Sequence, residues 1–82
     1  MQVTIKYFAS IREAIGQASE QRETTATTLA GLRDELLASG PTYACLSRGR
    51  AVRMALGQVM SDENALLSSG CEVAFFPPVT GG

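Results

Sequence analysis

The chain has 82 residues, 45% of them hydrophobic, and its seven basic and eight acidic residues leave a formal charge of −1. This length suits one small globular domain and excludes a second. The charge lacks the cationic excess of nucleic-acid binding proteins, and no stretch approaches the roughly 20 apolar residues of a membrane span. We therefore expect no nucleic acid and no membrane as partners. A strand-like pattern instead of a leader at the start predicts a cytoplasmic protein.

The residue types that usually bind metals are scarce. Cys45 and Cys71 do not form a C-x-x-C pair, and the chain has no histidine. A zinc site or a Cys–His nucleophile is therefore not supported, and we expect no bound metal. Both cysteines are expected as reduced, partly buried thiols, and the sequence leaves a disulfide between them open.

One local basic cluster comprises Arg48, Arg50 and Arg53. We interpret it as a solvated loop face. Contact with an acidic or phosphate-bearing partner is the alternative.

The first predicted element is a half-buried strand over residues 2–8, where apolar and polar residues alternate. Val3, Ile5 and Tyr7 share the core face. Phe8 falls out of phase, so it lies on the opposite face at the end of the strand.

A short helix is predicted over residues 9–15, with Ser10 as a possible N-cap and Gly16 closing it in a left-handed conformation. Three apolar residues recur at helical spacing: Ile11, Ala14 and Ile15. Residues 18–26 are almost wholly polar, so a strand there has to be an edge strand.

The main helix is predicted to start at an N-cap, Thr28, and to end at Gly40-Pro41. Its leucines form one apolar stripe, and its charged residues point away from that stripe. The stripe comprises Leu29, Leu32, Leu36 and Leu37, and the charged residues are Arg33, Asp34 and Glu35. A further helical turn is predicted around Tyr43 within residues 42–48.

A strand hairpin is predicted over residues 52–60, with Gly57-Gln58 as its tight turn and Val59-Met60 as a short return strand. Arg48-Gly49-Arg50 before it is interpreted as a turn. After the hairpin the pattern predicts a loop, a short helical turn and a turn into the last strand. These three segments are residues 61–64, 65–67 and 68–70.

The last strand places Val73 and Phe75 on the core face and Phe76 on the other. Pro77 and Pro78 end it, because proline fixes φ and donates no backbone hydrogen bond. We interpret residues 1–76 as the domain and 77–82 as a stiff, extended arm that reaches roughly 20 Å at about 3.3 Å per residue.

The arm ends in Gly81-Gly82, so its only reactive group is a main-chain carboxylate. A frayed tail is the alternative interpretation. The order of elements is typical of an α+β domain, with one curved sheet packed on a main helix.

Three segments carry a resemblance to a known family: Tyr7–Glu13, Thr28–Leu37 and, most specifically, Gly70–Gly82. The chain resembles the small subunits of molybdopterin synthase, the MoaD-type ubiquitin-like sulfur carriers. The resemblance implies a ubiquitin-like β-grasp fold, with one mixed sheet in which the first and last strands are parallel neighbours. The chain departs from the family pattern at Gly57, where an asparagine is usual, and at Cys71, where an acidic residue is usual.

The resemblance also implies that Gly82, preceded by Gly81, is the reacting residue. An E1-like adenylating enzyme uses ATP to convert the carboxylate of Gly82 to an acyl-adenylate. A sulfur-donating sulfurtransferase then leaves a thiocarboxylate, whose sulfur builds the dithiolene of molybdopterin on a cyclic pyranopterin precursor. The large catalytic subunit supplies the acid–base groups, so the chain is expected to be no enzyme by itself and to bind no cofactor.

In this family two small subunits join a large-subunit dimer as a heterotetramer. The alternative functions are a ubiquitin-like protein modifier, a sulfur carrier of another pathway such as thiamin synthesis, and an inert interaction domain.

If the first and last strands are parallel neighbours, Phe8 and Phe76 meet beside the root of the arm, and Met60 extends their patch. Exposed aromatic clusters usually mark partner sites. The alternative is that one ring covers a minor second core. The predicted partner-binding residues are Phe8, Met60, Phe76, Pro77, Pro78, Val79 and Thr80.

Overall fold

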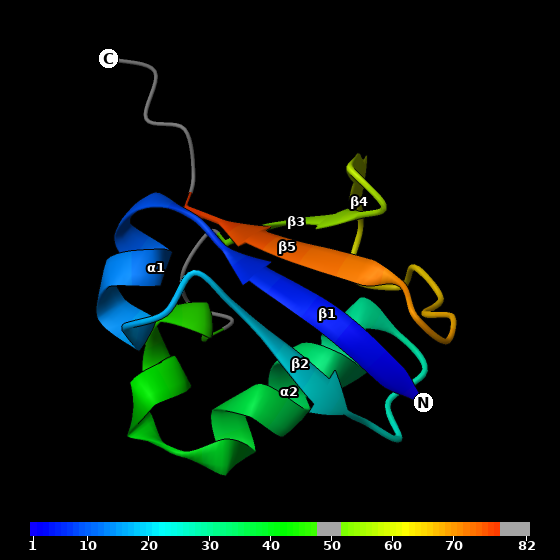
Figure 1. Cartoon of the computed structure of the whole chain (residues 1–82), viewed down its shortest axis with the longest axis horizontal. Helices are drawn as coiled ribbons and strands as arrows, with labels where there is room; N and C mark the ends of the chain where they lie inside the picture. Colours follow the sequence, from blue (N-terminus) through cyan, green and yellow to red (C-terminus); the bar gives the residue numbers. More distant parts are fainter. Residues whose placement is uncertain (48–51, 78–82) are drawn as a thin grey trace.

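The computed structural model describes residues 1–47 and 52–77. Its strands form one mixed sheet in the order β2-β1-β5-β3-β4. The elements are β1 (Gln2–Tyr7), α1 (Ala9–Ile15), β2 (Ser19–Glu23), α2 (Leu29–Ser39), a 3-10 helix η1 (Pro41–Leu46), β3 (Arg53–Leu56), β4 (Val59–Ser61) and β5 (Glu72–Phe76). Figure 1 shows the helices gathered on one side of the sheet, and no described helix covers the other side.

The centre of the sheet is the pair of β1 and β5. The two strands run parallel, with Ile5 beside Val73 and Tyr7 beside Phe75. The other pairings, β1 with β2, β3 with β5 and β3 with β4, are antiparallel. The predicted parallel neighbours are therefore confirmed, and the C-terminal ends of both strands lie at the same edge of the sheet.

The core lies between the sheet and the helices. All inward-facing residues predicted for the first and last strands are at most 1% exposed, which confirms the predicted alternation. They meet side chains from α1 and α2 in one cluster. The principal members are Val3, Ile5, Tyr7, Ile11, Ile15, Leu29, Leu32, Leu36, Leu46, Val73 and Phe75.

The polar segment around residues 19–23 does form an edge strand, β2, as predicted. Its charged and amide side chains discourage pairing with another chain along its free edge. The hairpin is also confirmed: Gly57 and Gln58 both have positive φ, 59° and 69°, which matches a two-residue turn between twisted strands. The predicted turn at residues 48–50 lies outside the described residues.

Helix α1 differs from the prediction at its start. Its N-cap is Phe8, with no side-chain cap, so the expectation of Ser10 at that position was wrong. The reason is that the chain turns sharply at Ala9, whose φ is +52°, so the helix begins directly after the strand. Gly16 closes the helix at φ +90° as predicted, and Ala14 is exposed and contributes nothing to the core.

Helix α2 begins as predicted, because the side chain of Thr28 accepts a hydrogen bond from the backbone N–H of Gly31. The prediction that Arg33 points away from the buried stripe was wrong. Arg33 is only 5% exposed, and its guanidinium lies 2.7 Å from a carboxylate oxygen of Glu63. The reason is tertiary, since the loop that carries Glu63 covers this side of the helix.

The same loop overturns the helical turn predicted at residues 65–67. The carbonyls of Glu63 and Ala65 accept hydrogen bonds from the N–H groups of Ala30 and Leu29, and Leu66 bridges to Thr28. The first N–H groups of a helix lack partners within it. The loop stays extended because its carbonyls supply those partners.

Three side chains hold η1 against the sheet. The hydroxyls of Tyr7 and Tyr43 both donate to the carboxylate of Glu20, at 2.6 and 2.9 Å. Burial and the hydrogen bond to Glu20 raise the pKa of the Tyr7 phenol far above its ordinary value, and the same causes raise the pKa of Tyr43. The folded protein therefore holds both phenolic protons more tightly than the unfolded chain.

This cluster predicts alkaline unfolding. Because the folded pKa values lie above the unfolded value of about 10, the stability from these phenols is complete below pH 10 and is lost as the pH rises above it. Tyr7 and Tyr43 are the only tyrosines in the chain, so phenolate absorbance should appear above pH 10, and the part that comes from Tyr7 only together with the loss of the circular-dichroism signal. Phenolate absorbance near pH 10 with an intact fold would contradict the prediction. The matched variant Glu20→Gln should titrate at lower pH than the unaltered protein.

Candidate functional site

The two phenylalanines left over by strand parity form a stacked pair. The rings of Phe8 and Phe76 lie 4.8 Å apart between centroids, at an interplanar angle of 13°. They meet because each follows the last inward pair of the two central strands, Tyr7 and Phe75. Phe8 is 41% exposed and Phe76 is half-buried. The predicted contact of the two rings is confirmed, and we call this pair the aromatic patch.

The backbone makes the patch rigid. The N–H of Phe8 donates to the carbonyl of Phe75 at 3.2 Å, which continues the ladder between β1 and β5 by one bond. The carbonyl of Phe8 accepts from the N–H groups of Ile11 and Arg12 at the start of α1. Phe8 is therefore fixed to both the sheet and the first helix.

One side of the sheet is covered by no described helix, and we call it the open face (Figure 1). Beside the aromatic patch, small residues form the surface of this face, and we call them the floor. Ala74 of β5 and Ala55 of β3 are paired across the strands, and they are only 6% and 3% exposed although no described helix covers them. In the same row lie Lys6 on β1 and Met60 on β4. Longer side chains around the two alanines must therefore cover them.

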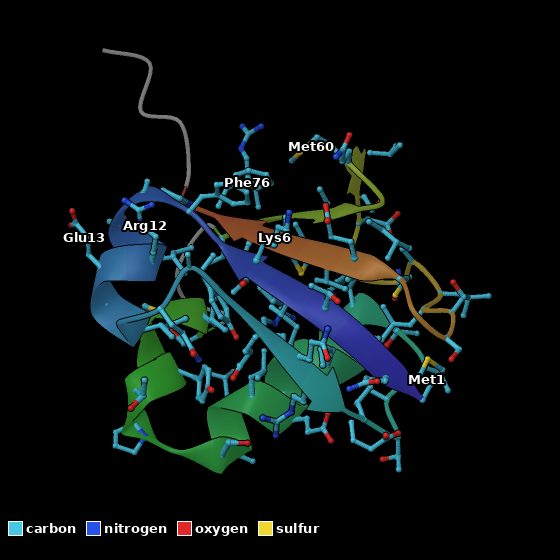
Figure 2. All side chains as sticks on the ribbon, in the orientation of Figure 1. Met1, Lys6, Arg12, Glu13, Met60 and Phe76 are labelled. Carbon is cyan, nitrogen blue, oxygen red and sulfur yellow. The ribbon has the colours of Figure 1, made fainter. Side chains whose placement is uncertain are left out.

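Met60 is 55% exposed and lies on the same face as the aromatic patch, separated from β5 by β3. Figure 2 shows Lys6, Phe76 and Met60 on the side of the sheet away from α2. The predicted placement of Met60 on this face is thus found. Its role in binding stays a prediction.

Charged side chains accompany the aromatic patch. The ammonium of Lys6 lies 3.3 Å from a carboxylate oxygen of Glu72, and the two side chains are 44% and 31% exposed. Arg53 is the cross-strand partner of Phe76 and is exposed. Sequence reasoning did not use Lys6, although alternation with Ile5 and Tyr7 already assigns it to the outer face.

Pro77 is described and half-buried, directly after β5. The other predicted arm residues lie outside the described residues. They are Pro78, Val79, Thr80, Gly81 and Gly82. Arg48 and Arg50 lie outside them as well, so of the basic cluster only Arg53 is placed.

Among residues 1–47 and 52–77, no group of three or more potential metal ligands comes together. Cys45 and Cys71 are both partly buried, and neither forms a disulfide. No described helix is both long and apolar enough to cross a membrane. The phenols of Tyr7 and Tyr43, whose pKa is raised, both contact Glu20 on the helix side of the sheet, away from the aromatic patch.

The ThiS family model matches residues 5–82. A molybdopterin synthase sulfur carrier subunit from Haemophilus influenzae is 35% identical over 81 residues, which are 98% of this chain and 99% of that protein. Among solved structures, SAMP1 from Haloferax volcanii matches with a TM-score of 0.80 at 22% identity, covering 100% of both chains. A chain in the complex of subunits 1 and 2 of the molybdopterin-converting factor from Helicobacter pylori matches at 0.69, with 25% identity and 100% of both chains covered. The ubiquitin-like β-grasp fold is thereby confirmed.

Proposed function

Because the chain belongs to the ThiS family, we propose that it is the sulfur-carrier subunit of a molybdopterin synthase. The observation that carries the proposal is the identity of 35%, over nearly the full length of both chains, with a relative that bears this name. The resemblance of the three sequence segments to the same family points in the same direction.

The proposed chemistry takes place at Gly82. A free carboxylate is ionised at neutral pH and is a poor electrophile, so it needs activation. An E1-like enzyme joins the carboxylate to the AMP part of ATP, with loss of pyrophosphate, and a sulfurtransferase then supplies the sulfur that displaces AMP. The resulting thiocarboxylate donates its sulfur to the cyclic pyranopterin precursor.

In this proposal the folded domain presents the arm to the large catalytic subunit. The aromatic patch lies directly beside Pro77, where the arm begins, so a partner that binds Phe8 and Phe76 receives the arm at a defined position. The similar chain from Helicobacter pylori is in complex with a second subunit, which supports a partner of this kind. The acid–base groups then come from that partner, which fits a chain without histidine.

Intact-mass spectrometry of the protein from cells that contain the activating enzyme tests the proposal. We expect a fraction whose mass reflects the exchange of one oxygen for sulfur, and a fragment ion that places the change on Gly82. Incubation with the large subunit and the precursor should return this fraction to the carboxylate form. An adduct with lysines of other proteins would instead indicate a ubiquitin-like modifier, and an unmodified terminus under all conditions would contradict sulfur transfer.

A further inference from the structure

Two cations flank the aromatic patch from different strands. Lys6 precedes Phe8 by two residues on β1, so both side chains leave the same face of the sheet. Arg53 lies on β3 directly across from Phe76. Both cations therefore lie on the face of the aromatic patch, Arg53 opposite Phe76 and Lys6 two residues from Phe8 with its ammonium toward Glu72.

The two alanines of the floor orient the long side chains around them. Ala74 is the cross-strand neighbour of both Lys6 and Ala55, and its near-complete burial on an uncovered face requires cover from neighbouring stems. A lysine covers apolar surface with its methylene stem while its ammonium stays in water. The ammonium of Lys6 lies 3.3 Å from a carboxylate oxygen of Glu72, which is paired with Thr4, so it is held on this face by Glu72 instead of extending freely into solvent.

Lys6 and Arg53 differ from the arginines whose side chains contact other parts of the folded domain. Arg33 is buried in an ion pair with Glu63, and Arg22 donates to Ser39 and lies near Glu35. Arg53 is exposed and has no ion pair with the described residues. Lys6 has an ion pair with Glu72, but an ammonium has three donors and can take a second carboxylate.

A cation inside an otherwise apolar docking face costs desolvation unless the partner supplies an opposite charge. The face carries the ion pair of Lys6 with Glu72 and the exposed Arg53 beside Phe8, Phe76, Met60 and two alanines, so apolar contact alone accounts for neither cation. Complementary charges at an interface mainly set specificity and the association rate.

We propose that Lys6 and Arg53 are specificity-determining residues of this docking face, and that the partner carries carboxylates on the rim of the apolar pocket that receives the aromatic patch. The partner is the large catalytic subunit, so the inference rests on the proposed function. It adds the chemistry by which that subunit distinguishes this carrier from one with a neutral face.

The test measures the affinity and association rate of the full chain for its cognate large subunit at low and high ionic strength. Lys6→Met and Arg53→Met each remove one positive charge and keep an unbranched stem over the floor. The matched control is Thr42→Glu, which makes the same change in net charge at an exposed position on η1, on the helix side of the sheet. A melting temperature equal to that of the unaltered chain shows that a variant is folded.

At low salt we expect each methionine variant to weaken binding about two- to fivefold, mainly through the association rate, and the double variant about tenfold. These differences should vanish near 0.5 M salt, where screening acts over only a few ångströms. Thr42→Glu should stay within about twofold of the unaltered chain at all salt concentrations.

Two outcomes would overturn the inference: methionine variants that bind as tightly as the unaltered chain at low salt, or an equal loss for Thr42→Glu. In both cases salt-insensitive binding of the large subunit would leave the proposed function intact. If the unaltered chain does not bind the large subunit at all, the proposed function and the inference both fall.

Discussion

A protein with one alanine added after Gly82 should fold normally and transfer no sulfur. Adenylation needs a free carboxylate on the residue that enters the active site, and the added residue moves that carboxylate beyond the glycine pair. The hydrophobic core ends at Phe75, so the change should leave the melting temperature unaltered. The measurement is molybdopterin formation in a reconstituted synthase, with intact mass to show that the added alanine is still present.

Full activity of an extended, unprocessed protein would overturn the assignment of Gly82. A second variant, Gly81→Phe, keeps the terminal carboxylate and adds bulk one residue before it. We expect the bulky side chain to block entry of the arm into a narrow channel of the partner enzyme. Activity should then be lost at adenylation, at sulfur transfer or at both steps. Normal turnover of this variant would show that the channel is wide.

Phe76→Asp should weaken binding of the large subunit at least tenfold. Burying a phenylalanine side chain in an interface stabilises the complex by about 1.5–3 kcal/mol, and an aspartate also places a charge where the partner is apolar. In the free domain Phe76 is half-buried and its main aromatic contact is the stack with Phe8. Loss of that stack costs about 1 kcal/mol, or roughly 4–8 °C in melting temperature for a domain of this size.

The neighbouring residue provides the control. Phe75 is fully buried on the opposite face, where its ring stacks on Tyr7 at 6.2 Å between centroids. Phe75→Ala should cost about 3–5 kcal/mol, which is a large share of the stability of a small domain. If Phe76→Asp unfolds the free protein as Phe75→Ala does, the aromatic patch is core. If it leaves the affinity unchanged, the interface lies elsewhere.

The alternation of the strands could be predicted because it depends only on local geometry. Successive side chains of a strand point to opposite faces. Val3, Ile5 and Tyr7 share one face because they are two residues apart, so Phe8 lies on the other face. The N-cap at Thr28, the left-handed Gly16 and the hairpin turn at Gly57 are equally local, and the structure confirms all three. The contact between Phe8 and Phe76 could be predicted only after the family resemblance had implied a parallel pairing of the two strands.

The features that were missed depend on segments far apart in the sequence. Arg33 is buried because a loop some 30 residues later brings Glu63 to it, and residues 65–67 stay extended because they complete the start of α2. The grouping of Lys6 and Arg53 has the same origin, since only the strand order β1-β5-β3 brings them to one face of the sheet. The side chains that face the core, the local turns and the caps can be read from the chain because each depends on a few adjacent residues. Which charges and loops lie together depends on the order of strands in the sheet, and only the folded molecule shows that order.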